Sequence, residues 1–174
     1  MRDATRRSFV TLLGAGVVAI PFRPAPATAS ADITMHGDAL GTDVWFDPVG
    51  LLVRPGATVT WQNDDPANSH TATAYHPANR NHPLRIPAGA APWSSDYLLP
   101  GERFSVILTT QGVYDFFCVP HEMAGMVGRI VVASPGTPPP LAPPDTGLAS
   151  AAHGEFPAVE TIVQRGAVHR GLTG

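Results

Sequence analysis

The chain has 174 residues and carries 11 basic and 14 acidic side chains, which gives a formal net charge of −3. This length suits one domain with extensions, and the excess of acid argues against nucleic acid and anionic membrane surfaces as partners. The 19 prolines and 17 glycines separate many short β-branched runs. Such spacing is typical of an all-β sandwich or barrel.

Residues 1–31 resemble a twin-arginine export signal rather than part of a fold. The pair Arg6-Arg7 precedes an apolar run over residues 10–20, which is too short to span a membrane. Small residues then offer cleavage sites at 27–29 or 29–31. Cleavage at the second site would bring the formal net charge to about −6. We expect an exported, periplasmic or otherwise extracytoplasmic protein without stable membrane insertion after signal removal; an uncut membrane anchor is the alternative.

The folded domain is predicted over residues 32–133, as a Greek-key β-sandwich or barrel of about eight strands. A long loop rich in Pro, Asn, His and Ala is expected over residues 76–93, and loops of that length in compact domains often carry function. The Pro-Gly pairs at 55–56 and 100–101 mark chain reversals. The expected strands cover residues 32–36, 44–46, 50–53, 57–61, 69–75, 95–98, 103–108, 113–117 and 129–133.

Residues 134–147 are predicted to form an extended linker, because this segment holds six prolines. The tail over residues 148–174 carries one short helical pattern. Val159 and Ile162 keep helical spacing, and Pro157 suits a first turn. We expect a short C-terminal helix that docks on the barrel, and a disordered tail is the open alternative.

The loop between the last two predicted strands gathers residue types that bind metals. It holds Cys118, the only cysteine of the chain, followed by His121 and Met126, with Gly125 and Gly128 beside the methionine. A lone cysteine cannot form an internal disulfide, and a metal explains a free thiol in an exported protein. Thiolate, imidazole and a weak thioether are the donors of a blue-copper electron-transfer site. One more imidazole must come from elsewhere in the chain.

His70 is our candidate for the missing imidazole, since it follows an early predicted strand. His76 and His82 compete with it, but they fall in the loop rich in Pro and Asn, where solvated or rim positions are expected. The axial thioether is assigned to Met126. Met123 competes for that role, but a ligand so close to the loop histidine would strain the loop.

Residues 114–132 resemble the C-terminal copper loop of plastocyanin, pseudoazurin and halocyanin, which are members of the cupredoxin family. The order Cys118, His121, Met126 has the plastocyanin spacing, and the surroundings of His70 match the early histidine of the family. The resemblance covers the whole predicted domain. It implies one type 1 copper ion per chain, with the two histidines and the cysteine in the trigonal plane and the methionine axial.

The resemblance also implies roles outside the ligand set. The backbone N–H of Thr71 is expected to point at the cysteine sulfur, where such bonds tune the metal. Phe117 replaces the tyrosine that plastocyanin has beside its cysteine, which puts a side-on electron exit in doubt. An apolar rim is expected around the edge of the loop histidine, formed by Pro120, Met123, Ala124 and Val127.

The implied function is that of a small exported carrier of single electrons, not an enzyme, which meets transient redox partners near His121. Two alternatives remain open. Copper delivery or storage would need an exchangeable site, commonly rich in Met or His. A copper oxidase or a subunit like that of nitrite reductase would need a second copper site with an open position, for which His76 and His82 of a trimer are the first candidates.

Overall fold

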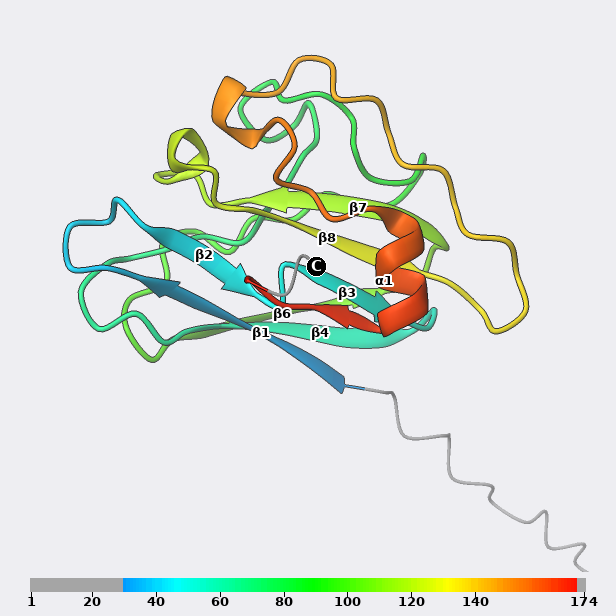
Figure 1. Ribbon diagram of the computed structural model, residues 1–174, viewed down its shortest axis with the longest axis horizontal. Helices are drawn as coiled ribbons and strands as arrows, with labels where there is room; N and C mark the ends of the chain where they lie inside the picture. Colours follow the sequence, from blue (N-terminus) through cyan, green and yellow to red (C-terminus); the bar gives the residue numbers. More distant parts are fainter. Residues whose placement is uncertain (1–29, 172–174) are drawn as a thin grey trace, which may run out of the picture.

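The computed structural model describes residues 30–171, which fold as two β-sheets packed together (Figure 1). The predicted export signal lies outside the described residues, apart from its last two positions. The first sheet has the order β2-β1-β4-β6 and comprises β1 (Ser30–Gly37), β2 (Val44–Asp47), β4 (Ala57–Asn63) and β6 (Arg103–Leu108). The second sheet has the order β5-β7-β8-β3-β9 and comprises β3 (Gly50–Val53), β5 (Thr73–Ala74), β7 (Gly112–Phe117), β8 (Val127–Val132) and β9 (Ala167–Val168).

Apolar side chains from the two facing sheets form the main core. Residues of β4 alternate between buried and half-buried, as expected for a strand with one face turned inward. Trp61 of this strand meets Phe116 of β7 edge-on at a ring-centroid distance of 5.3 Å, and this contact joins the two sheets. The all-β sandwich predicted from the sequence is therefore confirmed.

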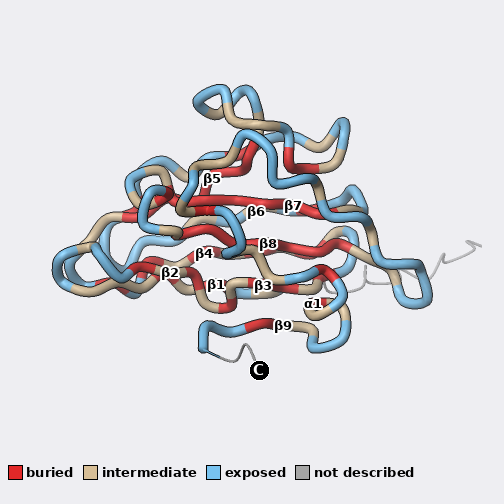
Figure 2. The backbone as a smooth tube through the Cα atoms, turned by 45° about the horizontal axis from the view of Figure 1, so that its top comes forward, coloured by how far each residue is buried: buried red, intermediate tan, exposed pale blue. Residues whose placement is uncertain are grey.

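The outer face of the second sheet is covered as well, so that all six residues of β8 are buried (Figure 2). The C-terminal segment provides this cover. It contains the 3-10 helix η2 (Ser150–Ala152) and the helix α1 (Val159–Arg165), and its strand β9 extends the sheet beside β3. Val159 and Ile162 of α1 pack against Val131 of β8. The sequence left a docked helix and a disordered tail as alternatives, and the structure has the docked helix.

A buried charge cluster fastens the C-terminal segment just before α1. The ring of Phe156 contacts the guanidinium groups of both Arg85 and Arg129, each 5.0 Å from the ring centroid. Both arginines also bind Asp115 of β7, whose side chain is fully buried. Arg129 donates a further hydrogen bond of 3.0 Å to the carbonyl oxygen of Pro157. The tail is therefore held by cation–π contacts and a hydrogen bond from buried arginines as well as by apolar packing.

Two of the predicted strands are reduced in the structure. Over residues 95–98 no strand forms, and the one β-bridge joins Leu98 to His70. Asp96, with a φ of 56°, adopts the left-handed conformation and interrupts extended structure there. Of the strand predicted over residues 69–75, only β5 is formed. These interruptions free the backbone to carry His70 into the interior instead of along a regular ladder.

The strand β1 begins two residues before the predicted start of the domain. Ser30 and Ala31 pair with Thr58 and Val59 of β4, in parallel register. Within residues 30–171, no helix has the length and apolar character needed to cross a bilayer.

Candidate metal centre

The loop that carries the predicted ligands is closed by its own backbone. Cys118 directly follows β7, and its N–H donates to the carbonyl oxygen of Met126 at 3.0 Å. The N–H of Met126 in turn donates to the carbonyl oxygen of His121 at 3.1 Å. The 3-10 helix η1 (Glu122–Ala124) lies between them and ends at Gly125, whose φ of 80° requires the freedom of glycine. These bonds fix the backbone positions of the three residues independently of any metal.

His70 arrives from the segment that follows β4. Asn63, the last residue of β4, donates from its side-chain amide to the carbonyl oxygens of Asn68 and Leu98, both at 2.9 Å. The backbones of His70 and Leu98 exchange both of their hydrogen bonds, at 3.1 and 2.8 Å. The segment is thereby tied to the chain on either side of the imidazole.

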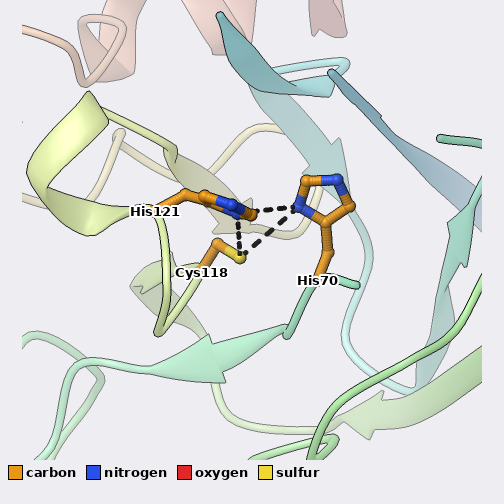
Figure 3. Close-up of side chains that lie close together, drawn as sticks. All are labelled: His70, Cys118 and His121. Atoms are coloured by element: carbon orange, nitrogen blue, oxygen red, sulfur yellow. Dashed lines mark hydrogen bonds between the residues drawn. The ribbon is translucent and has the colours of Figure 1, made fainter. Parts of the chain in front are cut away.

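The side chains of His70, Cys118 and His121 converge on one point (Figure 3). Cys118 Sγ lies 3.6 Å from His70 Nδ1 and 3.4 Å from His121 Nδ1, and the two nitrogens are 3.1 Å apart. A point equidistant from the three atoms lies about 2.0 Å from each, close to the bond length of a divalent metal with imidazole nitrogen. Within residues 30–171, this is the one group of His, Cys, Asp or Glu side chains with such spacing.

A carboxylate stands directly behind one imidazole of this group. Asp65 Oδ2 lies 2.9 Å from His70 Nε2, and neither side chain reaches solvent. Burial lowers the pKa of His70, which keeps the ring neutral near pH 7. Burial by itself would raise the pKa of Asp65, but hydrogen bonds from Asn68, Ala67 and His70 lower it to about 2. An ionised aspartate is therefore buried against a neutral histidine.

The thiol of Cys118 is fully buried and receives a hydrogen bond. The backbone N–H of Thr71 lies 3.3 Å from Cys118 Sγ, which confirms the contact expected for Thr71. The hydroxyl of Thr71 also accepts the N–H of Val119 at 2.8 Å, so one residue joins both halves of the centre. Burial raises the pKa of the Cys118 thiol to about 12. A bound cation would convert this thiol into a thiolate at neutral pH.

Comparison with known proteins identifies the metal that these donors bind in related proteins. Residues 33–133 match the family described as copper binding proteins, plastocyanin/azurin family. The chain belongs to this family. Because thiolate and imidazole are the donors that copper takes in electron-transfer sites, the residues present suit the metal that the family binds. The predicted cupredoxin resemblance and the predicted copper cofactor are both confirmed.

Individual relatives agree with the family assignment. The chain is 34% identical to plastocyanin of Tetradesmus obliquus over 122 residues, which cover 68% of this chain and 77% of that protein. It is 36% identical to plastocyanin of Scenedesmus fuscus over 106 residues, or 58% of this chain and 99% of the relative. Among solved structures, pseudoazurin of Methylobacterium extorquens AM1 is similar at 27% identity and a TM-score of 0.45, over 60% of this chain and 76% of that one.

The two methionines of the loop between β7 and β8 differ in exposure to solvent. Met126 is 0% exposed and belongs to the same core cluster as Cys118. Met123 is 72% exposed on η1. Burial beside the cysteine favours Met126 as the fourth donor, as the sequence predicts.

The two competing histidines make other contacts. His82 Nε2 lies 3.4 Å from Glu122 Oε2, and its ring packs on Phe117 at a centroid distance of 4.4 Å. His76 accepts the N–H of Ala78 on Nδ1 at 3.0 Å. Neither side chain belongs to the group of three donors, so the structure favours His70.

Sequence reasoning missed three polar residues near the centre, namely Asp65, Tyr75 and Glu122. Asp65 had a usable signal, because it stands a few residues before His70 in a short polar turn. The pair of Tyr75 and Glu122, whose hydroxyl and carboxylate are 2.8 Å apart, had none. These two residues are 47 positions apart and meet only through the fold.

The edge of His121 opens toward the surface between two loops. A Cβ placed on Gly41 would lie 3.3 Å from His121 Nε2, so the loop before β2 borders the imidazole. Leu40 of that loop is exposed and was not predicted. The prediction that Val127 lies in the rim is wrong, because this residue is buried in a second cluster with Tyr75. The exposed rim residues are Leu40, Pro120, Met123 and Ala124.

Proposed function

We propose that the protein carries single electrons through one type 1 copper ion, held by His70, Cys118 and His121 in a plane and by Met126 as axial donor. The convergence of a thiol and two imidazole nitrogens at mutual distances of 3.1 to 3.6 Å carries this proposal. When bound, copper supplies one-electron exchange between its Cu(II) and Cu(I) forms. The similarity to plastocyanins, which are electron carriers and not enzymes, supports a carrier.

The fold holds the donor side chains in place before copper binds. The Thr71 N–H fixes the sulfur, the closed backbone of the loop fixes His121, and the bridge to Leu98 fixes His70. Donors held in this way keep their positions when the charge at the centre changes. A small rearrangement between the two charge states permits fast exchange with a partner that docks only briefly.

Copper loading, optical spectroscopy and voltammetry test the carrier directly. The loaded protein should bind one copper per chain, show the intense blue absorption of a copper–thiolate bond, and give a reversible one-electron wave. Cys118→Ser should remove the blue absorption, while His153→Ala, which changes an exposed histidine, should leave it unchanged. A blue Cys118→Ser protein would refute the ligand assignment.

The same measurements separate the two alternatives. Transfer of Cu(I) to an acceptor without any reversible wave would indicate copper delivery or storage. Two copper ions per chain would indicate an oxidase or a subunit like that of nitrite reductase. The contacts of His82 with Glu122 and Phe117 argue against this histidine as ligand of a second ion.

We also propose that the protein is exported and works outside the cytoplasm. The twin arginine, the short apolar run and the small residues within residues 1–31 support export. Since β1 begins at Ser30, cleavage after Ala29 would leave the whole strand in the mature protein. Mass spectrometry of the mature chain should give Ser30 as the first residue, and Arg6→Lys with Arg7→Lys should retain the protein in the cytoplasm.

Redox partners are proposed to dock on the apolar rim around His121. The rim is uncharged and small, which suits weak and transient redox encounters. Leu40→Lys should slow electron transfer to a partner without changing the reduction potential, because Leu40 is exposed and lies outside the donor group. Leu141→Lys, at an exposed site in the linker, is the matched control and should leave the rate unchanged.

A further inference from the structure

The carboxylate of Asp65, which lies behind His70, is buried and fully hydrogen-bonded. Asp65 is 1% exposed, and both of its oxygens are occupied. Oδ1 accepts the backbone N–H groups of Ala67 at 2.8 Å and Asn68 at 3.1 Å. Oδ2 accepts the side-chain amide of Asn68 at 2.8 Å and faces His70 Nε2 at 2.9 Å. A Cβ on Gly37 would lie 2.3 Å from Oδ2, so this glycine lets β1 close over the carboxylate.

The groups that bind Asp65 satisfy it without cancelling its charge. The amide groups that bind Asp65 are dipoles, and each donates a hydrogen bond while carrying no net positive charge. Burial of a carboxylate is costly, and hydrogen bonds of this kind are what make it tolerable. A full negative charge therefore remains inside the protein, one imidazole ring away from the Nδ1 atom that faces Cys118.

We propose that Asp65 is a positioning residue, which holds His70 as the Nε2–H tautomer and lowers the reduction potential of the copper centre. With the proton on Nε2 shared with Asp65, the lone pair of Nδ1 faces Cys118 before copper arrives. Partial withdrawal of that proton strengthens Nδ1 as a donor, as carboxylates do behind other metal-bound histidines. This inference rests on the proposed copper site, but its first consequence concerns the metal-free protein.

The structure predicts what Asp65→Asn would do to the tautomer. The backbone N–H groups of Ala67 and Asn68 cannot rotate, so the amide oxygen of the new side chain would take the Oδ1 position. Its NH₂ group would then face His70. The imidazole would have to accept that hydrogen bond on Nε2, and its proton would move to Nδ1, the atom that copper needs.

The buried charge of Asp65 also determines in which direction the reduction potential of the copper centre shifts. A nearby anion stabilises Cu(II) more than Cu(I), and a stronger imidazole donor acts in the same direction. Loss of an outer hydrogen-bond partner typically weakens metal binding by about 10–100-fold. If the affinity for Cu(II) alone falls by about tenfold, the reduction potential of a one-electron couple rises by about 59 mV.

Nitrogen-15 NMR of the metal-free protein is the first test. Wild-type His70 should give the chemical shifts of the Nε2–H tautomer, and Asp65→Asn should give those of the Nδ1–H tautomer. Wild-type protein with its proton on Nδ1 would overturn the proposal. The wild-type measurement alone can overturn the proposal, so this test requires neither copper nor a folded variant.

Voltammetry of the copper-loaded proteins is the second test. Asp65→Asn should raise the reduction potential, and Asp64→Asn should leave it unchanged, because Asp64 is the adjacent aspartate but is exposed. Equal potentials in wild type and Asp65→Asn, with the blue colour intact in both, would overturn the role of Asp65 and leave the carrier proposal standing. Wild-type protein without a blue centre would instead overturn the carrier proposal.

Discussion

Asp115→Asn removes the charge that fastens the C-terminal segment to the sandwich. Asp115 Oδ1 accepts Arg129 Nε at 2.7 Å, and Oδ2 lies 2.7 Å from Arg85 Nη2 and 3.0 Å from Arg129 Nη2. The side chains of the two arginines are only 1% and 5% exposed. The substitution would leave both guanidinium groups buried beside a neutral amide.

The expected loss follows from what remains around each arginine. Breaking a buried ion pair by removing one partner costs about 3–5 kcal/mol. Arg85 keeps Asp145 at 2.9 Å, and this half-exposed carboxylate offsets part of the loss. We therefore expect Asp115→Asn to lower the free energy of unfolding by about 3 kcal/mol, the lower end of that range. Asp43→Asn breaks the exposed pair with Arg170 and should cost less than about 1 kcal/mol.

Urea unfolding of the metal-free protein measures both variants on one scale. The transition midpoint of Asp115→Asn should fall well below that of Asp43→Asn, with a similar slope if both still unfold in one step. The tail of Asp115→Asn should also become more accessible to limited proteolysis. If the two variants lose the same small amount of stability, the buried cluster does not hold the segment, and the reasoning fails.

Three further predictions concern the copper loop. Met126→Leu should keep the blue colour and raise the reduction potential, whereas Met123→Leu should change neither, because only Met126 is buried beside the cysteine. Burial raises the pKa of Cys118 from 9.0 to about 12, so the neutral thiol stabilises the metal-free fold below pH 9 and this contribution is lost as pH rises toward 12. Cys118→Ser should flatten that part of the pH profile of the unfolding free energy. Copper at a hundredfold excess over its dissociation constant should stabilise the wild type by about 2.7 kcal/mol, and calorimetry with and without the metal would contradict this if the transitions coincide.

The copper loop could be predicted because its donors are local in sequence. Cys118, His121 and Met126 lie within one turn between two strands, and glycines mark where that turn must bend. The second histidine was predicted from an analogous position, and its contact with Cys118 depends on the packing of two sheets. Periodicity cannot show such packing, since it reports which face a residue takes and not which distant residue it meets.

Features that depend on several distant residues at once were missed. Asp65 lies close to Asn68 and His70 in sequence, but the burial of its carboxylate also depends on Gly37 of β1, a distant residue that lets the strand close over it. The docked helix itself was predicted from the spacing of Val159 and Ile162. The buried charge cluster beside it was missed, because Asp115 lies in an ordinary strand pattern that gives no sign of its charged partners. The strand predicted over residues 95–98 failed for a local reason, because a left-handed residue is rare outside glycine and no pattern signals it there.

X-ray absorption at the copper edge, recorded on the oxidised and on the reduced protein, probes the central claim most directly. The preformed frame predicts one sulfur and two nitrogen neighbours in both states, with the nitrogens at about 2.0 Å and little change upon reduction. A spectrum without a sulfur neighbour, or one in which the number of neighbours changes with the charge of the metal, would contradict it.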